Sequence, residues 1–344
     1  MNCSEIRGFN YNGSWGTSGL DIWLHHQHGT MAEEIKRGKQ YFPKWNVARW
    51  WLSDEAFYRN PNKFLANLEA GLSVFDENEI LVVPVLFNRW RDPDCDFGGV
   101  ALEHIVPGFS TMSAFGIQDL FEFPADSANR KLTPIESNHY NYLNHVVSKY
   151  KDDERIFAWD LCNEPLMAPY SDDPENFITR AELKWVTWLY NTCKLLGATA
   201  PLFISNFANM NVMRMTEPIS DILSFHPYLI YNGEPKVGAE TVKEGFIKFL
   251  DGCVSLGEAT GKELYASETV WGDVDDAARV QQIHESLEEL KLRNIGFTVH
   301  ALQHSLVADL HYPEYGPFGK AGAMHFVNPD GKIRPGHEAF NQYC

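Results

Sequence analysis

Two glutamates, Glu164 and Glu268, each end a short apolar run of the kind that forms a buried strand. The runs read FAWDLCNEP over residues 157–165 and ELYASE over residues 263–268. A carboxylate half buried at a strand end must be paired, hydrogen-bonded or used in chemistry. Two such groups facing one cleft suit the cleavage of a glycosidic bond, in which one carboxylic acid protonates the leaving oxygen and one carboxylate acts at the anomeric carbon. Mutual repulsion and partial burial are expected to push their pKa values apart.

Other polar and aromatic residues follow the remaining apolar runs and extend this set. Arg49 could keep the nucleophilic carboxylate ionised, Tyr228 could donate a hydrogen bond to it, and Asn163 could reach a sugar hydroxyl. Exposed tryptophan faces could stack on the apolar faces of sugar rings. The candidate binding residues are Arg49, Asn163, His226, Tyr228, Trp15, Trp90, Trp271 and His300.

The elements that must position these residues follow a regular alternation. Eight apolar runs cover residues 6–11, 46–52, 80–87, 156–161, 201–205, 222–226, 263–267 and 296–302. Helical patterns lie between them over residues 60–75, from 133 onward, 173–196, 242–256 and 277–292, with a weak one over 206–218 and a short one at the C-terminus. Buried runs alternating with helices indicate parallel βα units.

Eight such units predict a single (β/α)8 TIM barrel over residues 1–344, with long βα loops after strands 3 and 8. A doubly wound open sheet is the lesser alternative. In a barrel the C-terminal ends of the strands meet at one mouth, so the candidate residues are expected to converge there. Trp50 and Trp51 alternate along the second strand, and only one of them can face that site.

Four segments resemble, in order, motifs of the clan A glycoside hydrolases, the retaining (β/α)8 group that includes the family 5 cellulases and mannanases. WDLCNEP (159–165) resembles the fourth-strand Asn-Glu-Pro signature, and SFHPY (224–228) the sixth-strand His-x-Tyr. YASETVWG (265–272) is similar to the seventh-strand nucleophile segment, and NVARWWLS (46–53) to the second-strand arginine segment. The similarity covers nearly the whole chain in the order and spacing of strands.

The resemblance implies a retaining β-glycosidase that needs no cofactor and acts on a carbohydrate substrate. It implies that Glu164 is the acid/base and Glu268 the nucleophile. Asn163 would bind the 2-hydroxyl, Arg49 and Tyr228 would orient Glu268, and His226 would line the site. The chain departs from the clan at the eighth strand, where FTVHALQHS (297–305) stands in place of the usual tryptophan. His300 or Gln303 could take that place, or Trp271 could supply the sugar platform.

Two other functions fit parts of the sequence. His26-x-His28, within WLHHQHGT, has metal-ligand spacing and would suit a metal-dependent TIM-barrel hydrolase. The fourth strand offers Asn-Glu where a bridging lysine would be expected, and the fifth ends in Ser-Asn without a histidine. Loop histidines are therefore the expected interpretation. A non-catalytic carbohydrate-binding barrel would normally have lost one carboxylate, whereas both are present.

The composition sets further bounds. A formal charge of −17 argues against nucleic acid or an anionic membrane as partner. The N-terminus shows no basic-then-apolar signal segment, which predicts a cytoplasmic protein as the sequence stands, or a secreted or periplasmic one if a signal was trimmed. The six cysteines have no CxxC spacing and are expected to be reduced and structural. Long segments at 88–131 and 304–336 would decide between cleavage at chain ends and internal cleavage.

Overall fold

Eight parallel strands form a closed barrel, in which each strand is hydrogen-bonded to the next and β8 to β1. The computed structural model describes residues 1–89, 134–166, 173–230, 241–305 and 323–344. The strands are β1 (Arg7–Tyr11), β2 (Val47–Trp51), β3 (Leu81–Val85), β4 (Trp159–Asn163), β5 (Leu202–Phe207), β6 (Leu223–His226), β7 (Leu264–Ala266) and β8 (Gly296–Val299). All eight predicted strands are present, and the predicted (β/α)8 fold is confirmed.

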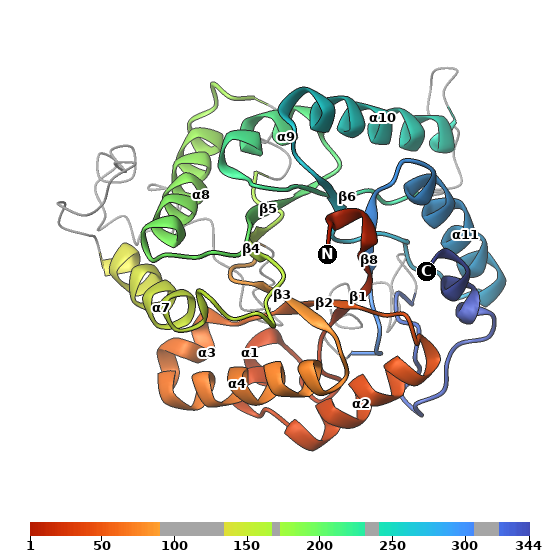
Figure 1. Ribbon diagram of the computed structural model, residues 1–344, viewed down its shortest axis with the longest axis horizontal. Helices are drawn as coiled ribbons and strands as arrows, with labels where there is room; N and C mark the ends of the chain where they lie inside the picture. Colours follow the sequence, from red (N-terminus) through yellow and green to blue (C-terminus); the bar gives the residue numbers. More distant parts are fainter. Residues whose placement is uncertain (90–133, 167–172, 231–240, 306–322) are drawn as a thin grey trace.

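Helices surround the barrel on its outer side, so the strands form a ring at the centre of the view in Figure 1. The α-helices are α1 (Gly19–Leu24), α2 (His28–Tyr41), α3 (Asp54–Arg59), α4 (Pro61–Glu77), α7 (Pro134–Tyr150), α8 (Phe177–Leu195), α9 (Met210–Thr216), α10 (Val242–Thr260) and α11 (Asp276–Leu292). Short 3-10 helices are η1 (Cys3–Glu5), η2 (Glu217–Ile219) and η4 (His337–Tyr343).

Local capping explains several helix boundaries. Asn60 accepts a hydrogen bond from the Lys63 amide at 3.1 Å, and Pro61 occupies the first turn of α4. Thr241 and Glu244 form a capping box at the start of α10. Two expectations were wrong. Helix α8 starts after an Asn176 cap instead of at residue 173, and the histidine-rich segment runs into α2 at His28 instead of forming only a loop. The short C-terminal helix is present, as the 3-10 helix η4.

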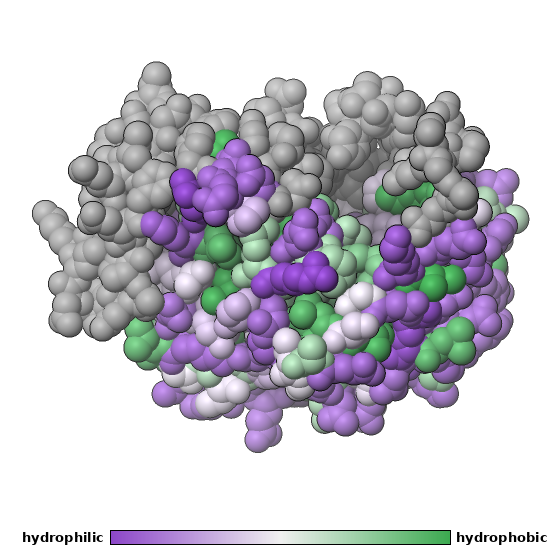
Figure 2. Space-filling model, turned by 90° about the horizontal axis from the view of Figure 1, so that it is seen from above, coloured by the Kyte–Doolittle hydropathy of each residue, from purple (hydrophilic) through white to green (hydrophobic). Residues whose placement is uncertain are grey.

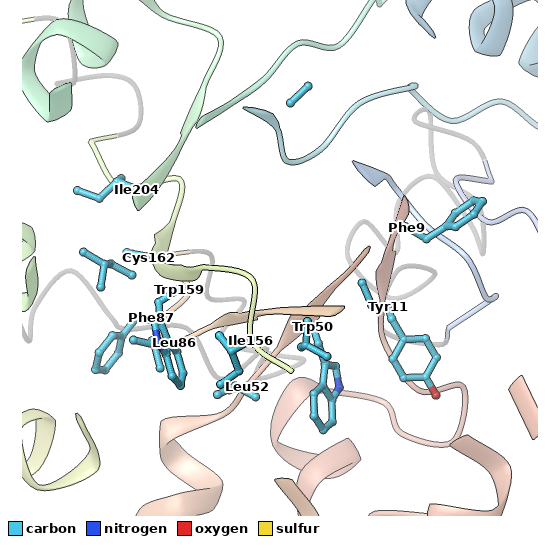
Figure 3. Packing of buried hydrophobic residues seen from close by; sticks show 14 of the residues in the cluster. Phe9, Tyr11, Trp50, Leu52, Leu86, Phe87, Ile156, Trp159, Cys162 and Ile204 are labelled. Atoms are coloured by element: carbon cyan, nitrogen blue, oxygen red, sulfur yellow. The ribbon is translucent and has the colours of Figure 1, made fainter. Parts of the chain in front are cut away.

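Two apolar clusters hold the barrel together. The smaller one fills the barrel interior with side chains from alternate strand positions, including Val47, Val83, Phe203 and Tyr265. The larger one lies between the strands and the helices and contains residues of both. Figure 3 shows part of this outer cluster, with Trp159, Cys162 and Ile204 among its labelled residues. The interior cluster occupies the barrel below the candidate site, so the functional groups lie on a packed base.

The surface is mixed in character. On the face seen in Figure 2, hydrophobic residues lie singly or in small groups among hydrophilic ones. In the described segments, none of the helices combines the length and the apolar character that a membrane span requires. Four of the cysteines that the structure describes are buried and free, namely Cys3, Cys162, Cys193 and Cys253, and Cys344 is free and partly exposed.

Candidate active site

A polar layer lies directly above the interior apolar cluster. Side chains alternate across a strand, so residues two positions apart point to the same face. Arg49 follows Val47 in this way, and Asp160 follows Ala158. The same two-residue step leads from Phe203 to Ser205, from Ile222 to Ser224 and from Tyr265 to Ser267. Each of these five strand segments therefore carries an apolar side chain at the base of the barrel and a polar one nearer its mouth.

An irregularity in β4 brings two of its polar residues to this layer. Asp160 and Asn163 are three positions apart and would point to opposite faces of a regular strand. The register between β4 and β5 shifts between these two residues, while Leu161 and Cys162 both pack in the outer cluster. The shift therefore turns both polar side chains inward, as β-bulges beside active sites commonly do.

The guanidinium of Arg49 is the centre of the network. It donates to Asp160 Oδ2 at 2.9 Å, to Glu268 Oε1 at 2.5 Å and to Asn163 Oδ1 at 2.8 Å. It also reaches Asn10 Oδ1 at 2.8 Å and Ser205 Oγ at 3.0 Å. Burial acts to lower the pKa of Arg49, but the charges of Asp160 and Glu268 raise it overall. Arg49 thus stays charged and fixes the orientation of five side chains, which come from β1, β4, β5 and the end of β7.

Glu268 is held from two sides as an ionised carboxylate. The Tyr228 hydroxyl donates to its Oε2 at 2.7 Å, opposite the contact from Arg49. Burial acts to raise the pKa of Glu268, but the positive charges of His226 and Arg49 outweigh it and lower the pKa to about 2. Burial and the adjacent carboxylate raise the pKa of Tyr228 well above its usual value, so the phenol remains a donor.

Glu164 occupies a different environment, at the end of β4. Its φ of 44° lies in the left-handed region, which is unusual for a residue other than glycine. Its Oε1 lies 2.7 Å from Nδ1 of His226, and the other ring nitrogen of His226 lies 3.0 Å from Ser267 Oγ. Glu164 is 9% exposed and Glu268 6%. One carboxylate is therefore partnered by an imidazole and the other by a guanidinium and a phenol.

The two carboxylates approach each other closely. One ligand atom each from Glu164, His226 and Glu268 lie within 4.8 Å of one another, and all three residues are buried. Among the residues that the structure describes, these three are the histidine, cysteine or acidic side chains whose arrangement could hold a metal ion. His26 and His28 do not belong to it. His26 instead lies between Trp15 and Trp23, and burial lowers its pKa to about 4.

His300, at the end of β8, borders Glu268, and Trp271, after β7, packs against Tyr228. His300 Nδ1 lies 3.8 Å from Glu268 Oε2. The ring of Trp271 meets that of Tyr228 edge-on, with centroids 5.0 Å apart. Gln303, the other eighth-strand candidate, accepts a hydrogen bond from Arg37 at 3.1 Å and donates one to the Asn328 carbonyl at 3.4 Å. Of the three alternatives for the missing tryptophan, His300 thus lies beside Glu268, and Trp271 lies against the tyrosine that donates to Glu268.

The remaining aromatic residues differ in whether they face the site. Trp15 donates to the Ile22 carbonyl at 3.0 Å, so its described contacts are with the N-terminal segment. Trp90 lies outside the described residues. Trp51, which was not among the candidates, places its ring 4.6 Å from the guanidinium carbon of Arg49. Trp50 packs outward on Trp23 at 5.0 Å, so Trp51 is the one of this pair that faces the site.

Four polar residues of the network were not among the candidate binding residues. They are Asn10, Asp160, Ser205 and Asn88, whose Oδ1 accepts from Asn163 Nδ2 at 3.1 Å. A signal existed for Asp160, because a carboxylate inside an otherwise apolar strand requires a buried cation. The serine and asparagine residues carried no such signal, since small polar residues also occur in ordinary barrel interiors.

Comparison with known proteins shows a shared fold. No protein-family model and no curated protein sequence matches the chain. Solved structures that match include an exo-β-1,4-mannosidase from Opitutaceae bacterium strain TAV5, at TM-score 0.69 and 16% identity over 98% of this chain. This chain spans 58% of the length of that protein. A glycoside hydrolase family 5 mannosidase from Rhizomucor miehei matches at TM-score 0.64 and 15% identity, over 98% of this chain and 92% of the other.

An endo-1,4-β-D-mannanase from Thermotoga petrophila RKU-1 also matches, at TM-score 0.63 and 12% identity over 98% of both chains. Identities this low establish a common architecture and leave the chemistry to the site itself. The chain therefore has the fold of a glycoside hydrolase family 5 mannosidase, in line with the clan A resemblance of its sequence.

Proposed function

We propose that the protein is a retaining β-glycosidase, a hydrolase of O-glycosyl bonds in β-linked saccharides. The observation that carries this proposal is the close approach, within 4.8 Å, of one oxygen from each of Glu164 and Glu268. Retaining enzymes place their two carboxyl groups about 5–5.5 Å apart, whereas inverting enzymes leave about 6.5–9.5 Å for a water molecule. The 4.8 Å limit joins single oxygens and not the centres of the carboxyl groups, and it favours the shorter of these two ranges, which supports retention and the covalent route.

In the proposed mechanism Glu268 is the nucleophile. Its carboxylate attacks the anomeric carbon while the proton of Glu164 passes to the leaving oxygen, so the glycosidic bond breaks as an ester to Glu268 forms. Glu164 then takes a proton from water, which attacks the same carbon and releases Glu268. The low pKa of Glu268 supports this division of roles, because a nucleophile must be ionised and an acid must carry a proton.

Two of the structural neighbours bear on the substrate. By their names, one is an exo-β-1,4-mannosidase and another an endo-1,4-β-D-mannanase. We propose β-mannosides as the substrates to test first, with β-glucosides and β-galactosides beside them. Single hydroxyl orientations separate these sugars, and Asn163, Trp271 and His300 are the candidate groups to sense them.

The test is a panel of aryl β-glycosides offered to wild type and to Glu268→Ala, with azide added to the variant. The expected result is loss of hydrolysis in the variant and formation of an α-glycosyl azide, since azide replaces the missing nucleophile on the opposite face of the sugar. Glu69→Ala is the matched control, because Glu69 lies on α4 and pairs with Arg155 at 2.9 Å. Undiminished hydrolysis by Glu268→Ala would overturn the proposal.

A further inference from the structure

Arg279 is a buried cation outside the ring of candidate catalytic residues. It lies in the first turn of α11 and is fully buried. Within the described part of the chain no carboxylate lies within ion-pair distance of it, and Asp273 acts on it only as a more distant charge. A buried charge that lacks an ion pair is costly unless hydrogen bonds compensate it. Burial and the neighbouring Arg334 lower the pKa of Arg279 to about 9, which leaves it protonated at neutral pH.

Backbone carbonyls take the place of a counterion. The guanidinium donates to the carbonyls of Val270 and Trp271, both just after β7. It donates also to the carbonyl of His300 at 2.9 Å, at the end of β8, and to that of Met324 at 2.6 Å. One side chain thus ties together three chain segments at the mouth of the barrel. A planar guanidinium, with several donors in fixed directions, suits this task better than an ammonium group.

Two of these segments carry groups that surround a single oxygen of Glu268. Trp271 packs edge-on against Tyr228, whose hydroxyl donates to Glu268 Oε2 at 2.7 Å. His300 Nδ1 lies 3.8 Å from the same oxygen. The titratable and charged side chains that face Glu268 are Arg49, His226, Tyr228, His300 and Glu164. Arg279 is linked to two of these five side chains. It binds the backbone carbonyl of His300 directly, and it is linked to Tyr228 through Trp271.

We propose that Arg279 is a positioning residue, which holds the segments after β7 and β8 so that Tyr228 and His300 meet Glu268. The inference rests on the proposed role of Glu268 as nucleophile. Arg334 stabilises neighbouring parts of the same segments, since it donates to the carbonyls of Asp273 at 2.7 Å and Ala323 at 2.8 Å. Loss of Arg279 leaves the carbonyls after β7 and β8 without their common donor, so the nucleophile and its partners lose their mutual geometry.

The experiment compares Arg279→Met and Arg279→Lys with wild type. Arg293→Met is the matched control, because Arg293 caps the other end of the same helix and pairs at the surface with Asp251 and Glu289. We expect kcat to fall by about 100-fold in Arg279→Met with KM little changed. The acid limb of the kcat/KM profile is expected to move to higher pH, because Tyr228 and His300 no longer stabilise the ionised carboxylate. Arg279→Lys keeps the buried charge, so it serves as the test variant if Arg279→Met does not fold.

Two further readouts separate positioning from simple instability. Guanidinium ion should restore part of the activity of Arg279→Gly, whereas ammonium should not. In protein labelled with fluorotryptophan, the Trp271 resonance, assigned with Trp271→Phe, should shift in every Arg279 variant and stay in place in Arg293→Met. Folded Arg279 variants with wild-type kcat, pH profile and Trp271 resonance would overturn the proposal. A wild-type protein that is inactive on every glycoside would instead overturn the proposed function. The Trp271 resonance would still test whether Arg279 positions the segment after β7.

Discussion

Arg49 Nη1 lies 2.5 Å from Glu268 Oε1, and neither side chain is more than 8% exposed. The same guanidinium lies 2.7 Å from Asp160 Oδ2, so a single cation neutralises two buried carboxylates. This arrangement explains how the barrel keeps an ionised Glu268 out of water. It also makes the stability of the barrel interior depend on one side chain.

Replacing Arg49 by methionine should therefore reduce both stability and activity. Removal of one partner from a buried ion pair costs about 3–5 kcal/mol, because the remaining charge has no partner. Denaturant unfolding measures the loss of stability, and kcat/KM measures the loss of activity. Arg155→Met is the control, since Arg155 pairs with Asp153 and Glu69 in a part-buried position, so its loss leaves no fully buried carboxylate without a partner. Equal losses in the two variants would contradict the role given to Arg49.

Tyr228→Phe should shift the acid limb of activity to higher pH. The folded-state pKa of Glu268 is below its unfolded value, so the ionised form and the stability it provides persist above about pH 4.3 and are lost as the pH falls towards 2. Removal of the Tyr228 hydrogen bond raises that pKa. We expect kcat/KM at neutral pH to fall about 10-fold or more.

The control for this experiment is Tyr190→Phe, because Tyr190 makes a similar hydrogen bond to Asp221 at 2.9 Å on the outer side of the barrel. The pH profile of kcat/KM should be unchanged in this variant. An acid limb that stays in place in Tyr228→Phe would show that Tyr228 does not stabilise the ionised form of Glu268.

Asp54 should give the opposite pH dependence of stability. Burial, followed by the charge of Glu55, raises the pKa of Asp54 to about 7. A raised folded-state pKa means that stability is fully present below about pH 3.9 and is lost as the pH rises to about 7. Asp54→Asn should therefore gain stability relative to wild type over this range, measured by thermal unfolding. The exposed Asp152→Asn is the control, and a parallel pH dependence of the two variants would refute the prediction.

Metal ions should inhibit the enzyme and should not be required. The ligand atoms of Glu164, His226 and Glu268 lie within 4.8 Å of one another, which suits a small divalent ion such as Zn²⁺. An ion there would occupy both carboxylates, so we expect Zn²⁺ to compete with the substrate and EDTA to leave activity unchanged. Loss of activity on chelation would revive the metal-dependent hydrolase that His26 and His28 suggested.

The sequence by itself determined the order of the elements and the main chemistry-bearing residues. Apolar runs separated by helical patterns are local features, and parallel strands that close into a barrel bring their C-terminal ends to one mouth. Glu164, Glu268, Arg49 and Tyr228 could therefore be named from their positions at strand ends. The helices α1, α2 and α3 were missed because the patterns over residues 19–59 are short or interrupted by polar residues.

Only the tertiary structure decided the contacts that span the barrel. The register shift in β4 reverses the side to which Asn163 points, and no alternation pattern reveals where a strand bulges. The choice of Trp51 over Trp50 depended on which face of β2 turned inward, and the partners of Arg279 are carbonyls, which every residue possesses. Sequence patterns report the face and the period of an element. Pairing between groups more than a hundred residues apart, such as Arg49 with Asp160 and Glu268, is set by how the strands pack.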